Sequence, residues 1–206
     1  MLHILKDTAS PDGAIALRGM FEARKRVFVD LLGWDVPVLA ERFEVDQFDD
    51  VHCAYLLLAD SAGGHLASAR LLPTTRPHIL DSLYPELCDG SAPRGPDIFE
   101  ITRFCLERDL SARDRRRVRD TLICGLVEYA LANGIRAYTA IAERRWLEQI
   151  QGFGWRTRAL GPQLGDGAAR LGALEIRIDP DTPRLVREAG LMPDDMLGRA
   201  PERAAA

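Results

Sequence analysis

The sequence predicts an α/β fold in which a mixed β-sheet is sandwiched by helices. Its 206 residues suit one domain with a single large core. Apolar residues at helical spacing alternate with short apolar runs typical of strands, with hairpin-like strands first and strand–helix–strand units later. We therefore expect a single domain over residues 1–190 and a flexible tail over residues 191–206, which ends in three alanines.

The N-terminal part predicts a short strand followed by a long helix. Residues 1–6 alternate weakly between apolar and polar side chains, and turn residues follow them. Apolar residues then recur at three-to-four spacing over residues 14–31, and Gly33 is a natural helix stop. We expect residues 34–42 to form a loop, because Pro37 interrupts any regular element there.

The next segment predicts an antiparallel hairpin and one further strand. Two apolar runs, 52–59 and 65–72, flank Asp60-Ser61-Ala62-Gly63-Gly64, which is a hairpin turn sequence. Five prolines punctuate the chain after this hairpin, so we expect only a short helical turn near 80–87 before a strand at 98–106.

The second half carries the clearest helix pattern of the sequence. Residues 113–132 present a broad apolar stripe that ends at Asn133-Gly134. The other expected elements are an interior strand at 137–142, a helix at 143–153, a strand after Trp155, a loop at 161–172, a strand at 173–178 and a helix at 182–189.

Composition excludes several classes of protein. The net charge of −4, with 47% hydrophobic and 28% charged residues, favours neither nucleic acid nor an anionic membrane as a partner. The N-terminus lacks the basic start and apolar core of a signal peptide, and no apolar run approaches the roughly 18 residues of a membrane span. We expect a cytoplasmic protein without stable membrane association. The cysteines are widely scattered, which favours reduced thiols over a metal site or disulfides: Cys53, Cys88, Cys105 and Cys124.

Common catalytic motifs are absent from the sequence. It contains no phosphate-binding P-loop, no G-x-S-x-G nucleophile elbow and no G-x-G-x-x-G. Gly152-Phe153-Gly154 lies between a short helix and a strand, so a turn is the better interpretation. What remains is acid–base chemistry and the orientation of substrates by charged side chains.

Charged residues occur where a strand or its rim should be apolar. Arg70 lies in an apolar strand and needs an anionic partner, which Asp46 and Asp49 could supply. On the strand at 98–106, Glu100 and Arg103 point to opposite faces unless a bulge or the strand end intervenes.

Two interpretations of these charges remain open from the residues alone. The acids and arginines could form an ion-pair network that pins a loop onto the sheet. Alternatively, they could line a polar cleft that accepts a cationic, amine-bearing substrate and uses Glu100 as general base. Phe28 and Trp34 would then form an aromatic wall for the cation, although two such aromatics are also common in a core.

Four ordered blocks resemble the acyl-homoserine-lactone synthase family, the LuxI-type autoinducer synthases. The resemblance extends over roughly residues 1–190. The blocks are Arg24-x-x-x-Phe28 with Gly33-Trp34, then Glu44-x-Asp46-Gln47-Phe48-Asp49, then Ala69-Arg70-Leu71-Leu72-Pro73-Thr74-Thr75-x-Pro77, then Phe99-Glu100-Ile101-Thr102-Arg103-Phe104. Thr102 stands where relatives often carry Ser, so a hydroxyl is kept. The eight signature positions are intact: Arg24, Phe28, Trp34, Asp46, Asp49, Arg70, Glu100 and Arg103.

The resemblance implies a fold like that of the GCN5-related N-acetyltransferases and an acyltransferase used in quorum sensing. In the implied reaction, the amine of S-adenosylmethionine attacks an acyl thioester, and the methionyl carboxylate then displaces methylthioadenosine to close the lactone. S-adenosylmethionine is a substrate, so no cofactor is implied. The acyl donor is acyl carrier protein or acyl-CoA. Two alternatives are an acyltransferase acting on another amine and a non-catalytic ligand-binding relative.

The resemblance also implies roles for individual residues. The catalytic set is Glu100, Arg103, Asp46, Asp49 and Arg70. The set that binds S-adenosylmethionine is Arg24, Phe28, Trp34, Arg103 and Phe104.

An acyl-chain pocket and a docking surface for the donor complete the implied site. The candidate pocket walls, each of which is also a common core residue, are Leu122, Leu126, Tyr138, Ala140, Ala142, Trp146 and Ile150. Counting back from Gly154, Ala140 falls where relatives that prefer 3-oxo chains often carry Thr, and its lack of a hydroxyl favours an unsubstituted chain. A shift of one residue in this count would put the adjacent Thr139 at that position and reverse the inference. Candidate docking residues are Arg144, Arg145 and Arg156, and arginines at 113–119 form a second basic cluster.

Overall fold

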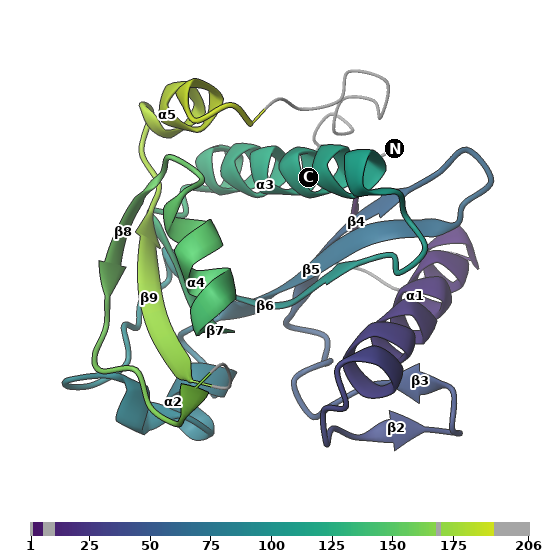
Figure 1. Ribbon diagram of the computed structural model, residues 1–206, viewed down its shortest axis with the longest axis horizontal. Coiled ribbons are helices and arrows are strands. Elements are labelled where there is room, and N and C mark those ends of the chain that lie inside the picture. Colours follow the sequence, from purple (N-terminus) through teal and green to yellow (C-terminus); the bar gives the residue numbers. More distant parts are fainter. Residues whose placement is uncertain (1, 6–10, 168–169, 192–206) are drawn as a thin grey trace. The chain divides into compact units, whose positions relative to one another are not determined.

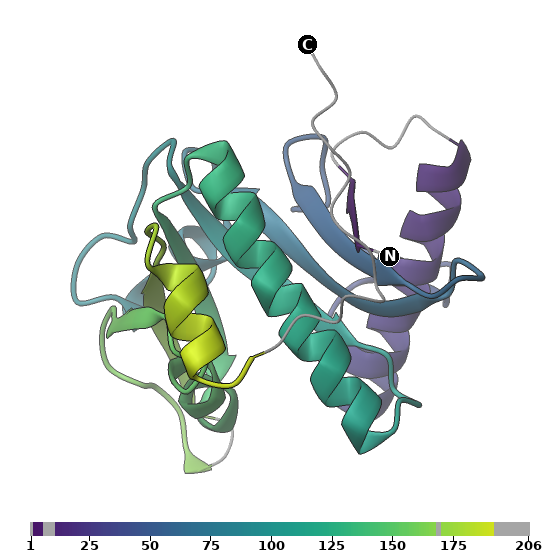
Figure 2. The ribbon, with the colours of Figure 1, turned by 90° about the horizontal axis from the view of Figure 1, so that it is seen from above.

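A computed structural model describes residues 2–5, 11–167 and 170–191 (Figures 1 and 2). Seven strands are hydrogen-bonded in the order β1-β4-β5-β6-β7-β9-β8, and β2 and β3 form a separate two-stranded sheet. The large sheet is mixed, because β6 and β7 are parallel while β1–β4, β7–β9 and β8–β9 are antiparallel. The predicted fold class is therefore confirmed. The predicted flexible tail beyond Leu191 lies outside the described residues.

The chain divides into two compact units. The first contains the described parts of residues 1–70 and 103–125, and the second contains residues 71–102 and the described parts of 126–191. Three elements pass from one unit into the other along the chain: β5 (His65–Pro73), β6 (Ile98–Leu106) and α3 (Ala112–Asn133).

The first unit begins with a strand and a long helical segment, as predicted. β1 (Leu2–Leu5) pairs antiparallel with β4 (Ala54–Ala59). α1 (Pro11–Arg24) continues directly into η1 (Lys25–Leu31), which is a π-helix. Gly33 follows with a φ of +68°, the left-handed conformation that glycine adopts readily at a helix end.

The expectation of a loop over residues 34–42 is wrong in part. β2 (Val38–Leu39) and β3 (Phe43–Glu44) form a small antiparallel hairpin that lies beside α1 in Figure 1. Ala40 and Glu41 make its turn with φ values of 51° and 56°. Because neither is the glycine or asparagine that usually marks such a turn, the sequence carries no hairpin signal here.

The hairpin turn before β5 forms as the sequence predicts. Asp60 Oδ1 accepts hydrogen bonds from the backbone N–H groups of Ala62 and Gly64, both at 2.8 Å. Asp60 N–H in turn donates to the Gly64 carbonyl at 2.9 Å. β5 then runs on as a nearly fully buried strand.

In the second unit, a proline-rich stretch contains only two short helical pieces. These are α2 (Ile79–Ser82) and η2 (Pro85–Leu87), in agreement with the predicted helical turn near 80–87. β6 has the bounds that the sequence predicts. α3 ends at Asn133, and Gly134 after it has a φ of +68°.

The remaining elements follow the predicted order. They are β7 (Ala137–Glu143), α4 (Arg144–Gln151), β8 (Arg156–Ala159), β9 (Leu171–Arg177) and α5 (Thr182–Glu188). β7 is the predicted interior strand, because it lies between β6 and β9.

Alternation along β7 defines two faces of the sheet in the second unit. Tyr138 points to one face, where its hydroxyl donates to the Leu126 carbonyl of α3 at 3.0 Å. Ile141 points to the other face and packs against the cluster that contains Leu80 of α2 and Ala173 of β9. Helices thus cover both faces of this part of the sheet.

Gly154 allows α5 to pack closely over the turn between α4 and β8. Its φ is +88°, and a Cβ at this position would lie 2.5 Å from the Leu185 carbonyl oxygen. Figure 2 shows α5 in yellow beside these green elements. Gly152-Phe153-Gly154 is therefore part of a turn, as the sequence indicates.

Candidate functional site

The first unit contains a network of three arginines and three carboxylates. These side chains come from the end of α1, from β3 and the loop after it, and from β5 and β6. The members are Arg24, Arg70, Arg103, Glu44, Asp46 and Asp49, and each side chain is at most 11% exposed. The formal charges cancel, which buried charges require in order to be tolerated.

Arg24 joins two of the carboxylates. Its Nε donates to Glu44 Oε2 at 2.5 Å, and its two Nη atoms donate to the Asp49 oxygens at 2.8 and 2.9 Å. Bidentate pairs of this kind fix both the distance and the orientation of the two groups. Arg24 therefore ties the end of α1 to β3 and to the loop that follows it.

Arg70 makes a second bidentate pair with the same loop. Its Nη1 and Nη2 donate to the Asp46 oxygens at 2.6 and 3.0 Å, and Nη1 lies 2.8 Å from Asp49 Oδ1. The prediction that Asp46 and Asp49 supply the anionic partner of Arg70 is confirmed.

Arg103 is the most exposed member of the network, with 11% of its side chain accessible. Its Nε and Nη2 donate to Glu44 Oε1 at 3.0 and 2.9 Å, and Nη2 also donates to Asp46 Oδ2 at 2.7 Å. Within the part of the chain that the structure describes, its Nη1 makes no hydrogen bond. The φ of Arg103 is +50°, so the backbone departs from strand geometry at this residue, which the sequence left open as a bulge. Such a conformation costs about 1–3 kcal/mol and is common at functional sites.

The network holds Asp49 in the charged form. Burial by itself raises the pKa of Asp49, but hydrogen bonds and charges from Arg24 and Arg70 lower that pKa well below its usual value. The Tyr55 hydroxyl donates to Asp49 Oδ1 at 2.8 Å, and burial together with Asp49 raises the pKa of Tyr55. Tyr55 is therefore a neutral hydrogen-bond donor.

Phe28 and Trp34 form an aromatic surface beside Arg103. Their rings stack with centroids 4.7 Å apart and an interplanar angle of 11°, and the Arg103 guanidinium carbon lies 5.8 Å from the Phe28 centroid. The π-helix carries Phe28, and the Phe28 carbonyl accepts the backbone N–H of Trp34 at 2.8 Å. Phe28 is buried while Trp34 is 37% exposed, so the indole offers ring surface to a ligand. Phe104, the next residue on β6, is half-buried.

Glu100 belongs to the second unit and is fully buried. Its Oε2 accepts the backbone N–H of Ile79 at 2.8 Å, and its Oε1 accepts that of Leu80 at 3.1 Å. The carboxylate therefore caps the start of α2. The two backbone donors thus hold both carboxylate oxygens in place at the start of α2.

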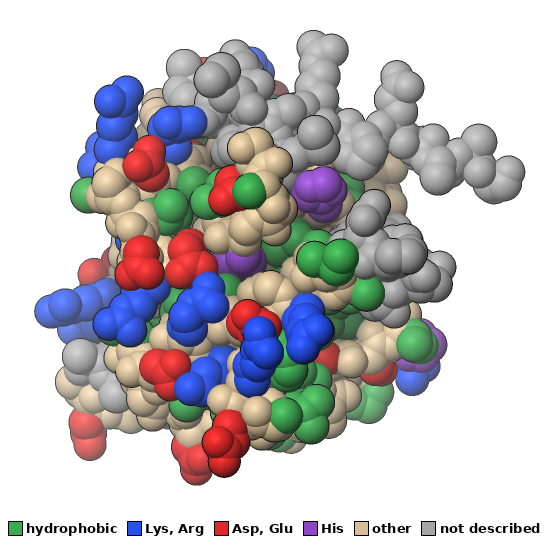
Figure 3. Space-filling view, turned by 90° about the vertical axis from the view of Figure 1, so that its right-hand side faces the viewer, with side chains coloured by type: hydrophobic (Ala, Val, Ile, Leu, Met, Phe, Trp, Pro, Cys, Tyr) green, Lys and Arg blue, Asp and Glu red, His purple; other side chains and the backbone are tan. Residues whose placement is uncertain are grey.

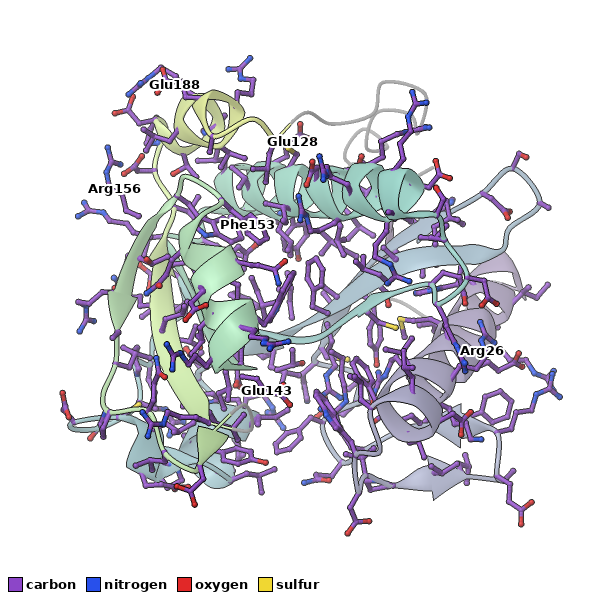
Figure 4. All side chains as sticks on the ribbon, in the orientation of Figure 1. Arg26, Glu128, Glu143, Phe153, Arg156 and Glu188 are labelled. Carbon is purple, nitrogen blue, oxygen red and sulfur yellow. The ribbon has the colours of Figure 1, made fainter. Side chains whose placement is uncertain are left out.

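Most of the candidate acyl-chain residues share one side of the sheet. Ala140 and Ala142 point to the same face as Tyr138, and Leu147 of α4 packs there too, since a Cβ on Gly172 would lie 2.8 Å from its Cδ1. Leu126, Tyr138, Ala140, Ala142 and Ile150 are all buried, and Trp146 is half-buried against Phe153, which Figure 4 labels. Leu122 is buried in the first unit. Thr139 points to the opposite face, which it shares with Glu100.

The three candidate docking arginines differ in their partners. Arg144 Nε donates to Glu148 at 3.0 Å, whereas Arg145 has no partner among the described residues. These two arginines line a surface hollow of about 300 Å³ with Glu148 and Gly167. Arg156, labelled in Figure 4, is paired with Asp179 and Asp181. The structure thus brings Arg144 and Arg145 together and leaves Arg156 in a separate ion-pair cluster.

Arginines and acids are mixed elsewhere on the surface too. On the face in Figure 3, basic and acidic side chains lie among one another. In the first unit, Arg42 pairs with Glu22 at 2.8 Å and Lys25 pairs with Asp30 at 2.8 Å. This face offers no extended area of a single charge.

One member of the network, Glu44, and one residue that binds the network, Tyr55, were not among the residues predicted for the site. Glu44 is fully buried and links Arg24 to Arg103, and Tyr55 binds Asp49. A charge count could have indicated Glu44, because three buried arginines need a third anion besides Asp46 and Asp49.

The described histidines and cysteines are further candidates for binding a metal ion. Within the described ranges, no group of three His, Cys, Asp or Glu residues could hold a metal ion. The four cysteines are free thiols, and burial raises the pKa of Cys105 to about 12. Among the helices of the described residues, none is both long and apolar enough to cross a bilayer.

Comparison with solved structures identifies proteins that share the fold. Two structures below 25% identity share the fold. One is a Lactobacillus plantarum protein named as a candidate N-acetyltransferase, with a TM-score of 0.55 and 15% identity over 87% of this chain and 98% of that one. The other is FeeM, an N-acyl amino acid synthase from uncultured soil microbes, with a TM-score of 0.59 and 14% identity over 93% of this chain and 99% of that one. BjaI, a CoA-dependent acyl-homoserine lactone synthase solved with S-adenosylmethionine and isopentyl-CoA, is more similar, with a TM-score of 0.84 and 26% identity over 100% of this chain and 95% of that one.

Sequence comparison identifies the family. Residues 13–185 match the autoinducer synthase family. The chain is 33% identical over 165 residues to the acyl-homoserine-lactone synthase of Ralstonia nicotianae, covering 77% of this chain and 80% of that protein. It is 34% identical over 172 residues to the synthase of Rhizobium etli, covering 80% of each. The chain belongs to the autoinducer synthase family and is an acyltransferase of the acyl-homoserine-lactone synthase class.

Proposed function

We propose that residues 1–190 work as one synthase domain that joins S-adenosylmethionine to an acyl thioester and releases an N-acyl-homoserine lactone. The substrate amine attacks the thioester carbonyl, and the donor thiol leaves. The methionyl carboxylate oxygen then attacks the carbon next to sulfur, and methylthioadenosine leaves. The net products are the lactone, the thiol, methylthioadenosine and one proton.

The observation that carries this proposal is the arrangement of Arg103 with Phe28 and Trp34. S-adenosylmethionine carries a sulfonium, an ammonium and a carboxylate. The exposed indole of Trp34 suits a sulfonium, and the Nη1 group of Arg103 suits the carboxylate. The same arginine would keep the carboxylate in place for the lactonisation step.

The other charged members of the network would act as positioning residues. Arg24 donates to Asp49 and Arg70 donates to Asp46, as described above. The side chains of all four residues are at most 5% exposed. Their role would be to hold Arg103 and the loop after β3 in a fixed geometry. Phe104 would add apolar contact beside Arg103.

Glu100 would serve as the general base through a water molecule. A protonated amine cannot attack a thioester, so the ammonium must lose a proton first. Glu100 is fully buried and holds two backbone N–H groups, which favours a relayed transfer over direct contact. Glu100 and Arg103 lie three residues apart on β6, so one strand supplies both groups.

The acyl donor would approach the second unit, where the acyl chain would enter between the sheet and the helices. Ala140 shares the face of Tyr138 and Ala142 and offers no hydroxyl, which supports an unsubstituted chain. Arg144 and Arg145 beside their surface hollow suit the phosphates of CoA or the acidic surface of acyl carrier protein. Solved neighbours named as CoA-dependent, BjaI and MesI, make acyl-CoA the first donor to test. The cytoplasm would supply both substrates.

The test is mass spectrometry of the purified protein with S-adenosylmethionine and matched panels of acyl-CoA and acyl carrier protein thioesters. We expect an N-acyl-homoserine lactone, and the preferred thioester identifies the donor and chain length. Acylation of a different amine, or ligand binding without turnover, would contradict the proposal. Arg145→Glu tests docking separately: it should raise the KM for the donor and leave the KM for S-adenosylmethionine unchanged.

A further inference from the structure

The π-helix η1 contacts the end of β6 outside the charged network as well. Phe28 of η1 packs against Cys105 of β6 in a buried apolar cluster. Arg26, labelled in Figure 4, donates from Nη2 to Oε2 of Glu107 at 2.7 Å, and Glu107 directly follows β6. Because Arg103 lies on the same strand, both contacts bear on how Phe28 lies relative to Arg103.

Glu107 is held from several sides. Its backbone N–H donates to the Leu66 carbonyl of β5 at 2.8 Å, and its own carbonyl accepts Nη2 of Arg115 on α3 at 3.1 Å. Its Oε1 accepts the backbone N–H of Arg108 at 2.8 Å, and its side chain is 17% exposed. With the backbone and one carboxylate oxygen held in this way, the other oxygen is a fixed acceptor for Arg26.

His65 faces the same carboxylate oxygen but is not its charged partner. The imidazole Nδ1 lies 3.8 Å from Glu107 Oε2, which is too long for a hydrogen bond, and Nε2 lies 3.0 Å from Ser68 Oγ. Burial lowers the pKa of His65, so the imidazole carries no charge at neutral pH. Ser68, His65 and Glu107 stand in the order of a hydrolytic triad, but Ser68 is 1% exposed, so its hydroxyl is closed to a substrate. The carboxylate therefore has a positioning task, and its charged partner is Arg26.

Arg26 depends on this one contact for its charge pairing. Within the described ranges, no other carboxylate pairs with its guanidinium. It precedes Phe28 by two residues in η1, and the Trp34 ring stacks on the Phe28 ring at 4.7 Å. The π-helix is a rare conformation that occurs as short segments, frequently at functional sites. A shift of its first turn would move both rings relative to Arg103.

We propose that Glu107 is a positioning residue for S-adenosylmethionine, which acts through Arg26 to hold η1 against β6. With η1 held in this way, the Phe28 and Trp34 rings meet the sulfonium while Arg103 binds the carboxylate of the same molecule. Glu107 itself does not touch the substrate. The inference rests on the proposed function, in the part that assigns S-adenosylmethionine to Arg103 and the aromatic pair.

The test is a double-mutant cycle on Arg26 and Glu107, measured as the Kd for S-adenosylmethionine by titration calorimetry and as the KM for both substrates. Glu107→Gln keeps the shape and removes the charge, and Arg26→Met keeps an apolar stem and removes the guanidinium. We expect each single variant to raise the Kd for S-adenosylmethionine about fivefold and to leave the KM for the acyl thioester unchanged. The double variant should bind no more weakly than either single variant, because each residue acts through the other.

Glu22→Gln is the matched control. Glu22 pairs with Arg42 at 2.8 Å, and the two side chains are 24% and 57% exposed, close to the 17% and 43% of Glu107 and Arg26. That pair joins α1 to the turn between β2 and β3, so breaking it leaves the contact between η1 and β6 in place. The control should keep the wild-type Kd for S-adenosylmethionine.

A purely structural role for the Arg26–Glu107 pair predicts a different pattern. The variants would then lose thermal stability and bind S-adenosylmethionine with the wild-type Kd. That result, an equal change in the control, or additive effects in the double variant would overturn the inference.

The calorimetric titration contains no acyl donor, so it separates this inference from the proposed reaction. If the cycle gives the expected result but no lactone forms with any thioester, the proposed function fails and the positioning role of Glu107 stands. If lactone forms but the single variants bind like the wild type, the inference fails alone. If the wild type binds no S-adenosylmethionine, both fail.

Discussion

Glu44 is the most informative position for testing the network by mutation. It is fully buried and accepts three hydrogen bonds from two arginines. Glu44→Gln preserves the side-chain volume but removes the negative charge. The network would then contain three arginines and two carboxylates, and the new amide group would present N–H donors to guanidinium donors.

The expected loss of stability follows from this geometry. Breaking a buried ion pair by removing one partner costs about 3–5 kcal/mol, because the other charge stays buried without compensation. The loss of three charge-assisted hydrogen bonds, each worth about 1.5–3 kcal/mol, sets an upper bound on the loss of stability. The Gln amide oxygen still accepts hydrogen bonds, so the expected loss lies below that bound. A change of 1 kcal/mol shifts the thermal midpoint by about 2–4 °C at this chain length, so we expect a decrease of roughly 6–20 °C.

The assay is thermal unfolding followed by circular dichroism, with Glu22→Gln as control. Glu22 also pairs with an arginine, Arg42 at 2.8 Å, but both side chains are partly exposed at 24% and 57%. Exposed pairs contribute about 0–1 kcal/mol, so the control should unfold within a few degrees of the wild type. If Glu44→Gln unfolds at the same temperature as Glu22→Gln, the network is not a compensated buried cluster and the reasoning fails.

Three further outcomes are expected. Since the folded pKa of Asp49 lies below its unfolded value, its stabilising contribution is present above about pH 4 and is lost as the pH falls further, so the urea midpoint should drop more steeply with acid in the wild type than in Asp49→Asn. Trp34→Leu should raise the KM for S-adenosylmethionine about tenfold with a change in unfolding free energy below about 1 kcal/mol, because the ring is 37% exposed. Gly154→Ala should lower the thermal midpoint by several degrees, since its Cβ would lie 2.5 Å from the Leu185 oxygen, whereas Gly19→Ala in α1, with open space around it, should be neutral or stabilising.

Elements with a strong local pattern were predictable from the sequence. The strand at 98–106 has the observed bounds of β6, because prolines precede it and its apolar residues favour an extended chain. The helix at 113–132 and its stop at Asn133-Gly134 follow from apolar spacing and a left-handed glycine. Local signals of this kind depend on neighbours that are close in sequence.

Features that depend on distant contacts were not predictable in the same way. The π-helix at Lys25–Leu31 has no separate signature in a pattern of apolar spacing, although it carries Phe28. The burial of Glu44 depends on arginines 20 and 59 residues away in sequence. The cap that Glu100 makes on α2 joins residues that are 20 and 21 positions apart in sequence. It gives the carboxylate a structural role beside its expected role in the chemistry.

The strand register of β7 shows which face each of residues 139 and 140 occupies, which counting along the sequence does not show. Ala140 and Thr139 are adjacent, so a shift of one residue would exchange their roles in the sequence argument. The pairing with β6 and β9 puts Ala140 on the side of Tyr138 and Thr139 on the side of Glu100. The absence of a hydroxyl at position 140 can therefore be tested directly with Ala140→Thr and a 3-oxo donor.

The measurement that tests the central claim most directly is the stoichiometry of thiol and methylthioadenosine released in one incubation with S-adenosylmethionine and the preferred acyl thioester. Amide formation releases the thiol, and lactonisation of the same molecule releases methylthioadenosine. The account predicts equal amounts of both at completion, together with an equal amount of lactone. Thiol release without methylthioadenosine would show transfer to an amine without ring closure, and methylthioadenosine without thiol would show cleavage of S-adenosylmethionine alone; either result would contradict the account.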